Sequence, residues 1–470
     1  MEIPFICCSY SHGLTMKTMS QQQQLKKSQR FIEKLVTNHK AHQSVWQRLP
    51  THTERWNVSE AHSGHKANQD EASFAKAMMT AQQYSKWKWP KRPIFFIADP
   101  HADAEAFVNS LVASGGIKVT NKTLLAFKLT QLGRDATFII GGDCLDKGPS
   151  NLALLDAVKR LFDTGARVKL LAGNHDMRLY MGIYAMGLPR HPTTEHLFVR
   201  MGEKVIPLLS EVHQRYLKGK KLPKSTPDEA SCKEALFPRA DWFEQFPQYA
   251  SSLMTNAGIK RELRKMQRKY DHFEAACDKA GFSMRDVYAT AMKCRQLFLR
   301  PQGEYAWFFK RMQLSYRRGS FLFLHAGLDD EISQTIQQEG VAKLNKQFRR
   351  QIKNDLFLFY YGSLANTMRT KYRDSDLSLS EKGVEQINRQ GIHALVQGHI
   401  NRKHGQRMVL KHGLLHVESD VTLDRHSRHK EGLKGVGIGV TIIHPQQQLI
   451  GLSVDYEFAK VFHPHFYNMQ

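Results

Sequence analysis

The sequence lacks a membrane-spanning segment, because no apolar run approaches the roughly 20 residues that a transmembrane helix requires. Its first residues also lack the basic leading segment, long apolar stretch and small-residue cleavage site of a secretory signal, so we expect no signal peptide. Cysteines are few: there are six, without paired spacing, and only Cys7 and Cys8 lie close together. This usage is typical of reduced thiols, shows no zinc-finger pattern and predicts a cytoplasmic protein.

Acidic residues are also scarce relative to basic ones, since 44 Asp and Glu face 68 Lys and Arg and give a formal charge of +24. Such a charge favours anionic partners, namely phosphorylated substrates, nucleic acid or an acidic surface. The alternative is that solvated Lys and Arg merely keep the protein soluble. The charge does not choose between the two, and nothing in the sequence indicates an oligomeric state.

The 470 residues can hold two or three domains, or one core with large insertions. Residues 1–90 resemble an N-terminal extension, in which a glutamine run (Gln21–Gln24) leads into a helical pattern and then a polar linker. We expect a core formed by residues 91–179 and 319–470. Between these two parts, residues 180–318 are predicted to form a large helical insertion that could cap the active site.

Five short apolar runs each end directly in a polar motif. These runs are 94–97, 137–140, 168–171, 321–324 and 393–396. Strand, motif-bearing loop and helix in succession predict an α/β fold whose buried strands present ligands at their carboxyl ends. Towards the end of the chain, residues 414–417, 436–443 and 449–454 alternate like further strands, and the last two are predicted to form a hairpin.

The motifs supply oxygen and imidazole nitrogen ligands. They are Asp99-Pro100-His101, Gly142-Asp143-Cys144-Leu145-Asp146-Lys147-Gly148, Gly173-Asn174-His175-Asp176, Leu324-His325-Ala326-Gly327 and Gly398-His399. Divalent Mn, Fe, Zn or Co suits such mixed ligation, and a carboxylate such as Asp143 can bridge two ions. Two ions about 3.5–4 Å apart hold a water of lowered pKa that can attack phosphorus in line. His175 could then give a proton to the leaving oxygen, with Asp146 or Asp176 orienting its ring.

Each motif alone has an ordinary structural explanation, because Gly-Asp and Gly-Asn are common in turns and an isolated histidine is usually part of a core. Their joint occurrence, in order and each after a strand, favours a dinuclear metal site. The set resembles the calcineurin-like metallophosphoesterase superfamily, whose pattern is D-x-H, G-D-x-x-D-R-G, G-N-H-[ED], H and G-H. The resemblance covers roughly residues 93–177 and 320–420.

The resemblance implies a β-sandwich flanked by helices and a role for each motif residue. Asp99, His101 and Asp143 would hold one metal; Asp143, Asn174, His325 and His399 would hold the other; and His175 would be the leaving-group acid, paired with Asp146.

Details of the motifs are most similar to the branch of serine/threonine phosphoprotein phosphatases and diadenosine tetraphosphatases. Gly398-His399-Ile400-Asn401 lacks the second histidine of nuclease-like branches. Two departures concern the remaining pattern: Lys147 stands where that branch usually has a phosphate-gripping arginine, and Ala102 replaces a glycine. Arg369 is a candidate for a second phosphate-binding cation, although a solvated basic helix face explains it equally well.

We therefore predict a metallophosphoesterase that acts as a phosphatase on phosphoprotein or small phosphomonoester substrates. A dinucleoside polyphosphate hydrolase is the alternative, followed by a nuclease or other phosphodiesterase, and a non-catalytic scaffold is the last. Nucleic acid is not the favoured partner, because the basic clusters 218–221 and 261–269 contain few aromatic residues for stacking. We interpret both clusters as solvated faces, which would draw anionic substrate to the site if they are functional.

Overall fold

The computed structural model of the protein describes residues 21–37, 43–57 and 71–467. Cys7 and Cys8, and the expected linker at 58–70, lie outside the described residues. The described cysteines are all unpaired and buried; they are Cys144, Cys232, Cys277 and Cys294. Within the described ranges, no helix has the length and apolar character needed to cross a membrane.

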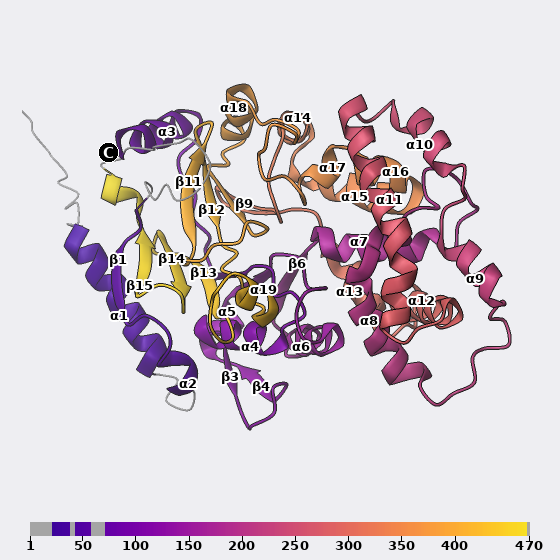
Figure 1. Ribbon diagram of the computed structural model, residues 1–470. Coiled ribbons are helices and arrows are strands. Elements are labelled where there is room, and N and C mark those ends of the chain that lie inside the picture. Colours follow the sequence, from indigo (N-terminus) through magenta and orange to yellow (C-terminus); the bar gives the residue numbers. More distant parts are fainter. Residues whose placement is uncertain (1–20, 38–42, 58–70, 468–470) are drawn as a thin grey trace, which may run out of the picture.

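The larger of two facing sheets has eight strands (Figure 1). In order across the sheet they are β1 (His52–Arg55), β15 (Phe458–Phe462), β14 (Gln448–Ser453), β13 (Gly439–His444), β2 (Ile94–Ile97), β5 (Thr137–Ile140), β6 (Arg167–Leu171) and β7 (Met312–Gln313). Strands β2, β5, β6 and β7 are parallel, whereas β13 pairs with β2 and β14 in antiparallel fashion. The β13–β14 pair is the predicted hairpin.

The second sheet has five strands. In order they are β11 (Arg407–Lys411), β12 (Leu414–Glu418), β10 (Ala394–Gln397), β9 (Phe321–Phe323) and β8 (Tyr316–Arg318). Strands β9, β10 and β12 are parallel. The sheets pack face to face through apolar side chains, as where the rings of Phe96 and Phe323 lie 5.9 Å apart. The predicted sandwich flanked by helices is thereby confirmed.

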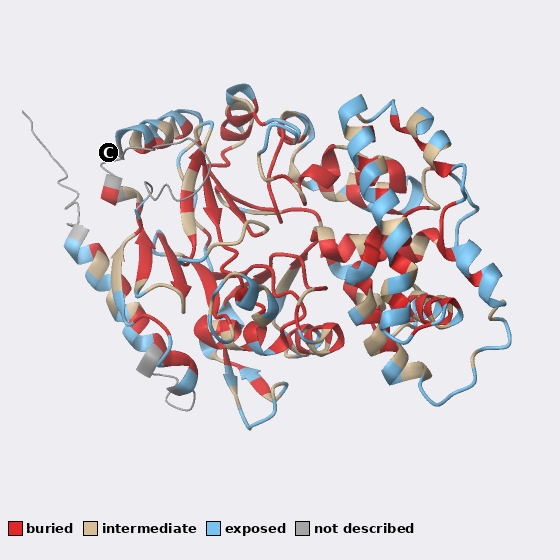
Figure 2. Cartoon of the chain, in the orientation of Figure 1, coloured by how far each residue is buried: buried red, intermediate tan, exposed pale blue. Residues whose placement is uncertain are grey.

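The central strands are buried along their whole length, which explains why they are continuous apolar runs rather than alternating ones. Figure 2 shows this burial across both sheets, while the helices expose their outer faces. Because β2, β5 and β6 run parallel to one another in the large sheet, and β9 runs parallel to β10 in the other, the loops that follow the strands of each set leave from the same end. This arrangement brings the sequence motifs to one edge of the sandwich.

Helices and a small hairpin cover the sheets and their edges. They are α4 (Ala104–Ala113), β3 (Ile117–Val119), β4 (Phe127–Leu129), α5 (Gln131–Asp135), α6 (Asn151–Asp163), α14 (Asp330–Glu339), α18 (Glu381–Arg389), α19 (Arg425–Lys430) and η4 (Pro464–Tyr467). Helices α4 and α6 begin where the first two motifs end, and their first turns are capped by the side chains of Asp103 and Ser150. The caps fix where each motif loop turns into its helix.

Between β6 and β7 the chain is helical, and we call residues 180–318 the helical segment. The helices from this part are α7 (Asn174–Ala185), η2 (Val199–Val205), α8 (Ile206–Val212), η3 (His213–Leu217), α9 (Glu229–Leu236), α10 (Trp242–Ala250), α11 (Asn256–Lys279), α12 (Met284–Leu299) and α13 (Ala306–Arg311). Strands β7 and β8, at the end of the segment, already belong to the two sheets.

A second group of helices packs beside α10 and α11 of the helical segment (Figure 1). It consists of α15 (Val341–Asn354), α16 (Leu356–Tyr361) and α17 (Ser363–Asn366). The ring of Phe246 on α10 lies 6.1 Å from Phe357 and 5.7 Å from Tyr361 on α16. Aromatic contacts of this kind join two stretches that are far apart in the sequence.

The described part of the first 90 residues packs on the core. It consists of α1 (Gln21–Thr37), α2 (Gln43–Trp46), β1 and α3 (Glu71–Tyr84). Strand β1 extends the large sheet by pairing in parallel with β15, and α1 packs against β1. The sequence of β1 is polar and therefore does not predict a strand. A strand at the edge of a sheet can form without apolar side chains.

Candidate metal centre

The six predicted metal ligands lie on loops at the carboxyl ends of strands from both sheets. Asp99 and His101 follow β2, Asp143 follows β5, Asn174 follows β6, His325 follows β9, and His399 follows β10. Glycines in these loops allow a close approach: a Cβ at Gly398 would lie 2.0 Å from Oδ1 of Asp99, and one at Gly173 would lie 2.3 Å from Oδ1 of Asp143. The loops can therefore converge only because these positions carry no side chain.

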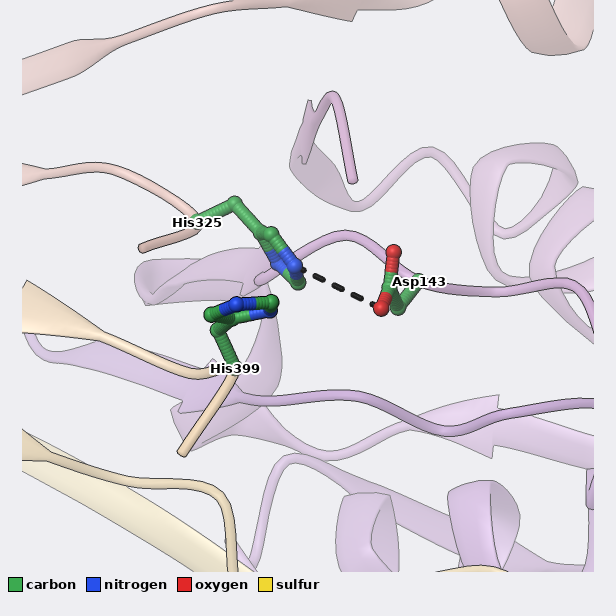
Figure 3. Close-up of side chains that lie close together, drawn as sticks. All are labelled: Asp143, His325 and His399. Carbon is green, nitrogen blue, oxygen red and sulfur yellow. Dashed lines mark ion pairs between the residues drawn. The ribbon is translucent and has the colours of Figure 1, made fainter. Parts of the chain in front are cut away.

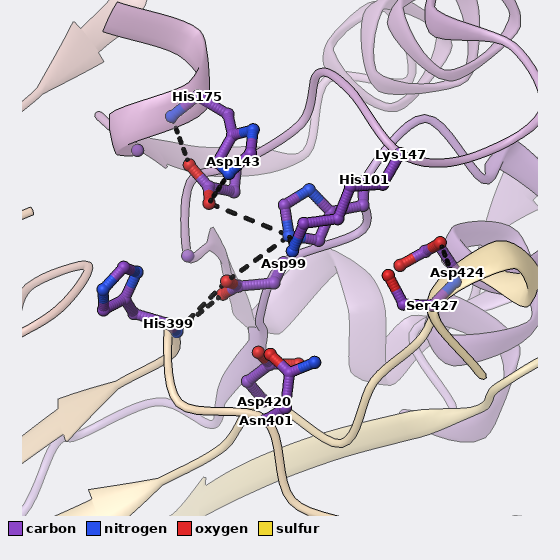
Figure 4. Close-up of polar contacts among 12 residues, drawn as sticks. Asp99, His101, Asp143, Lys147, His175, His399, Asn401, Asp420, Asp424 and Ser427 are labelled. Atoms are coloured by element: carbon purple, nitrogen blue, oxygen red, sulfur yellow. Dashed lines mark hydrogen bonds and ion pairs between the residues drawn. The ribbon is translucent and has the colours of Figure 1, made fainter. Parts of the chain in front are cut away.

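A first group of potential ligands consists of Asp99, His101 and Asp143, whose ligand atoms lie within 4.8 Å of one another. The Nε2 atom of His101 is 4.0 Å from Oδ2 of Asp99 and 3.8 Å from Oδ2 of Asp143 (Figure 4). All three side chains are buried. The group can offer two carboxylates and one imidazole to a cation.

A second group consists of Asp143, His325 and His399 (Figure 3). Nε2 of His325 lies 3.4 Å from Oδ2 of Asp143, and the two histidine rings are 5.1 Å apart. Asn174 adjoins this group, with its Oδ1 atom 3.3 Å from Nε2 of His325. Asp143 belongs to both groups, which is the position that a bridging carboxylate would occupy.

Each histidine of the two groups gives one ring nitrogen to a backbone carbonyl. The pairs are His101 Nδ1 with the oxygen of Leu145 at 3.2 Å, His325 Nδ1 with that of Gly141 at 2.8 Å, and His399 Nε2 with that of Arg369 at 3.1 Å. A carbonyl requires a proton on the nitrogen that contacts it, so the other nitrogen of a neutral ring is left as an acceptor. Metal-binding histidines in proteins are commonly held in this way.

Charge at the centre is unbalanced without a cation. Burial, together with the nearby Asp420, raises the pKa of Asp99 well above its usual range. Burial alone would lower the pKa of His325, but Asp143 and Asp99 outweigh that effect and raise it to about 10. Closely packed buried carboxylates that draw protons or cations in this way suit a site for divalent ions, and the donors present fit such ions.

The backbone of the centre is strained. Several residues other than glycine have a positive φ, namely Asp99 (45°), His101 (39°), Ala102 (53°), Asp143 (51°), Asp146 (68°), Lys147 (70°) and His399 (66°). Each such conformation costs roughly 1–2 kcal/mol for an L-residue, and strain of this kind concentrates at functional sites.

His175 and Asp146 form a buried pair beside the two groups. Nδ1 of His175 lies 2.8 Å from Oδ2 of Asp146, and the backbone N–H of His175 donates to Oδ1 of Asp143 at 2.8 Å. Burial raises the pKa of Asp146 to about 6 and lowers that of His175 well below its usual range. Asp176, the other carboxylate considered for orienting the ring, instead accepts the N–H groups of Cys144 and Leu145 at 2.9 and 3.1 Å.

The two predicted phosphate-binding residues are placed differently. Nζ of Lys147 lies 2.7 Å from Nε2 of His101, within the first group (Figure 4). The guanidinium of Arg369 lies 4.7 Å over the ring of Tyr360 and donates to the Tyr360 carbonyl at 2.5 Å, while its own carbonyl contacts His399. In this arrangement Lys147 faces the centre, and Arg369 supports it through its backbone.

A glutamate of the helical segment braces the loop that carries Asp146. The carboxylate of Glu211, on α8, accepts hydrogen bonds from Ser150 Oγ (2.7 Å), Asn151 N (2.7 Å), Asn151 Nδ2 (2.8 Å) and Leu152 N (3.0 Å). Oδ1 of Asn151 in turn accepts the N–H of Asp146 at 2.9 Å. The first turn of α6 is thus held from outside the sandwich.

Three residues of the site escaped the sequence analysis. Asp420 is buried just after β12 and raises the pKa of Asp99; the strand pattern that precedes it could have signalled it, as it did for the other motifs. Arg178 lies one helical turn after Asn174 on α7, and Lys204 lies on η2. Both act electrostatically on His175 and Asp146. For Lys204 the sequence offers no signal.

Comparison with known proteins agrees with this geometry. A family model for the calcineurin-like phosphoesterases matches residues 92–400. A search of curated proteins finds no match. Among solved structures, a cold-active protein-tyrosine phosphatase of a psychrophilic Shewanella is 13% identical with a TM-score of 0.37, over 79% of this chain and 80% of that one. A protein serine/threonine phosphatase from Saccharomyces cerevisiae is 13% identical with a TM-score of 0.36, over 84% of this chain and 90% of that one.

The family model rather than the structural likeness decides the assignment, because it spans more than half of the chain and includes the motif residues from Asp99 to His399. This protein belongs to the calcineurin-like phosphoesterase family and is a phosphoester hydrolase.

Proposed function

We propose that the chain is a phosphatase that hydrolyses phosphomonoesters of proteins or small molecules at a two-metal centre. The observation that carries the proposal is the sharing of Asp143 between two groups of potential ligands, beside the His175–Asp146 pair. Asp99, His101 and Asp143 would hold one ion. Asp143, Asn174, His325 and His399 would hold the other.

Bound divalent ions, of Mn, Fe, Zn or Co, would supply Lewis-acid stabilisation of the phosphoryl oxygens and lower the pKa of a coordinated water. The chain's own part is to hold the ligands rigidly, through the carbonyls behind each histidine and through the packed strands beneath. Lys147 would contribute a point charge to the phosphoryl group, in place of the two-pronged contact of an arginine. Arg369 is the second candidate for this role, for which its guanidinium would have to leave the ring and carbonyl of Tyr360.

His175 would donate a proton to the leaving oxygen. Asp146 holds its Nδ1 atom, which leaves Nε2 free to face the centre, 3.9 Å from Oδ2 of Asp143. Burial lowers the pKa of the ring well below its usual range, which favours the neutral form before substrate arrives. A phosphoryl dianion placed beside the ring would raise the pKa of His175, so the acid form would accumulate when it is needed.

A dinucleoside polyphosphate hydrolase is the second candidate. The observation that favours it is the presence of Arg178 and Lys204 close to His175 and Asp146, since these cations could neutralise further phosphates. A nuclease is less well supported. Asn401 stands where nuclease-like branches have a second histidine. Its Nδ2 donates a hydrogen bond to Glu431 at 2.5 Å, which indicates a structural role.

The unpaired state of the described cysteines supports a reducing compartment, such as the cytoplasm, as the place of action.

A substrate panel tests the proposal. Purified protein supplied with Mn²⁺ should hydrolyse p-nitrophenyl phosphate and a phosphopeptide faster than bis-p-nitrophenyl phosphate, and removal of metal by a chelator should abolish both activities. Preference for a dinucleoside polyphosphate would support the second candidate. Preference for the diester, with binding that weakens steeply with salt, would overturn the phosphatase assignment in favour of a nuclease.

A further inference from the structure

A pocket of about 650 Å³ opens beside the metal centre, between η2 and α11 of the helical segment and the start of α7. Six basic side chains line it: Arg178, Arg200, Lys204, Lys265, Arg268 and Lys269. Among its lining residues only Glu203 is acidic. The volume lies within the range of sites for small molecules, roughly 300–1,000 Å³, so the pocket is large enough for a ligand rather than a single ion.

One face of α11 supplies most of this charge. Lys265, Arg268, Lys269 and His272 all line the pocket; Arg268 and Lys269 each lie three or four residues from both Lys265 and His272. This spacing places them on a single stripe of the helix. Lys260, just before the basic run at 261–269, and Arg264, within it, do not line the pocket, and both are exposed. The cluster at 261–269 is therefore divided, with one part turned towards the pocket and the other towards solvent.

The protein neutralises little of this charge itself. The Arg200 guanidinium is paired with the buried carboxylate of Glu262. Within the described part of the chain, Arg178, Lys204, Lys265 and Arg268 form no ion pair, and Lys269 donates to the backbone oxygen of Arg200. Burial and then the neighbouring Arg200 and Arg178 lower the pKa of Lys269 to about 6. Cations crowded against one another in this way favour the binding of an anion.

The pocket adjoins the reaction centre through shared wall residues. Arg178 and Met201 line both this pocket and a smaller cavity whose walls include Asp146 and His175. Arg178 is also one turn of α7 beyond Asn174, a potential metal ligand. A ligand in the pocket would thus lie next to a phosphoryl group at the metal centre.

We infer that the pocket binds a second phosphoryl group of the substrate, so that the enzyme prefers small molecules that carry two or more phosphoryl groups. The inference rests on the proposed function in one respect, that the substrate is cleaved at the metal centre. The binding of a phosphoryl group in the pocket does not depend on it. Arginine and lysine are the usual ligands of phosphoryl oxygens, and several of them around one cavity suit a group of high negative charge. Phe273 is the one Phe, Tyr or Trp among the lining residues, and it is buried, so the imidazole of His272 is the pocket's one exposed ring on which a nucleic-acid base could stack.

The test compares two double variants of α11 that remove the same charge. Lys265→Gln with Arg268→Gln alters the pocket, whereas Lys260→Gln with Arg264→Gln alters the solvent face. With p-nitrophenyl phosphate as substrate, we expect the first variant to raise the inhibition constant of tripolyphosphate by about 10- to 100-fold, at roughly tenfold or less per lost contact. Its kcat/KM for p-nitrophenyl phosphate and the inhibition constant of orthophosphate should stay within about threefold of wild type, because a single phosphoryl group binds at the metals.

The solvent-face variant should resemble wild type in all three measurements. Equal weakening of tripolyphosphate inhibition by the two double variants would show a general effect of net charge and would overturn the inference. Circular dichroism checks that both variants fold, which the exposure of all four side chains leads us to expect.

Direct binding separates this inference from the proposed function. Titration calorimetry of chelator-treated protein with tripolyphosphate needs no catalysis and no metal. The inference is supported if the pocket variant binds tripolyphosphate more weakly than wild type and the solvent-face variant binds it equally well. This result would count even if the protein hydrolysed none of the substrates. Absence of binding to wild type would overturn it. Tighter pocket-dependent binding of a doubly phosphorylated peptide or of oligothymidylate than of tripolyphosphate would overturn the choice of a small molecule.

Discussion

Nδ1 of His175 lies 2.8 Å from Oδ2 of Asp146, and both side chains are buried. If this pair supplies the proton for the leaving group, His175→Ala should lower kcat by about 10²- to 10⁴-fold. Metal content should be unchanged, because His175 belongs to neither group of potential ligands. Steady-state kinetics and elemental analysis of the purified variant check the two expectations.

The leaving group provides the control for this prediction. Loss of the acid should matter most for alkyl phosphates, whose leaving alkoxide needs a proton, and least for p-nitrophenyl phosphate, whose leaving phenolate is stable. An equal loss for both substrates would mean that His175 acts in some other way, such as by holding the phosphoryl group. Unchanged rates for both would exclude it from the reaction.

Asp143→Asn should reduce the binding of both metal ions, because Asp143 is the one residue that the two groups share. His399→Ala, which touches the second group alone, should reduce the content by about one equivalent. Elemental analysis after dialysis against Mn²⁺ distinguishes these outcomes. Two full equivalents in Asp143→Asn would contradict the bridging role.

Ala102→Gly should stabilise the protein by about 0.5–1 kcal/mol. The backbone at Ala102 has φ 53°, a conformation that costs an L-residue roughly 1–2 kcal/mol. Glycine would remove this cost, but part of the gain would be offset because glycine gives the unfolded chain more conformational entropy. Ala106→Gly, the same exchange inside α4, should instead destabilise by about 1 kcal/mol. Urea denaturation measures both, and a loss of stability in Ala102→Gly would show that the methyl group contributes more through packing than it costs through strain.

The Arg200–Glu262 pair should make the helical segment sensitive to acid. Burial opposes the ionisation of Glu262, but Arg200 outweighs it and holds the pKa at about 2, below the ordinary 4.5. The unfolded chain therefore binds a proton at a pH where the folded chain does not. The stability that this difference contributes, about 3 kcal/mol, is complete above pH 4.5 and is lost as the pH falls towards 2.

Glu262→Gln should accordingly destabilise the protein by about 3 kcal/mol at pH 7, with the difference from wild type shrinking between pH 4.5 and 2. Free energies of unfolding in urea across this range measure it. Glu385→Gln, which breaks the exposed pair with Arg389, serves as the control and should have little effect at any pH. A difference that does not depend on pH would show that Glu262 acts through packing rather than charge.

The central strands and the motif loops could be predicted from the sequence because burial and chemistry leave local traces. The run at Ile94–Ile97 is apolar throughout since both faces of β2 are covered, and Asp99 follows it directly. Strand β1 left no such trace, because its pairing with β15 depends on backbone hydrogen bonds at an edge rather than on side chains.

The basic pocket, and its proposed binding of a second phosphoryl group, could not be predicted from the sequence. Arg264 and Lys265 are adjacent basic residues of the run at 261–269, so the sequence alone does not show that Lys265 lines the pocket and Arg264 does not. Only the packing of α11 against η2 separates them. Lys218, Lys220 and Lys221, by contrast, are exposed, as expected for a solvated face.

The hydrogen bonds of Glu211 mean that the helical segment is not a detachable module. Shortening the chain to its sandwich would strip the first turn of α6 of its acceptor and loosen Asn151, and with it the loop of Asp146, two hydrogen bonds away. Transplanting the segment between relatives should therefore succeed only when Glu211 and Asn151 travel together.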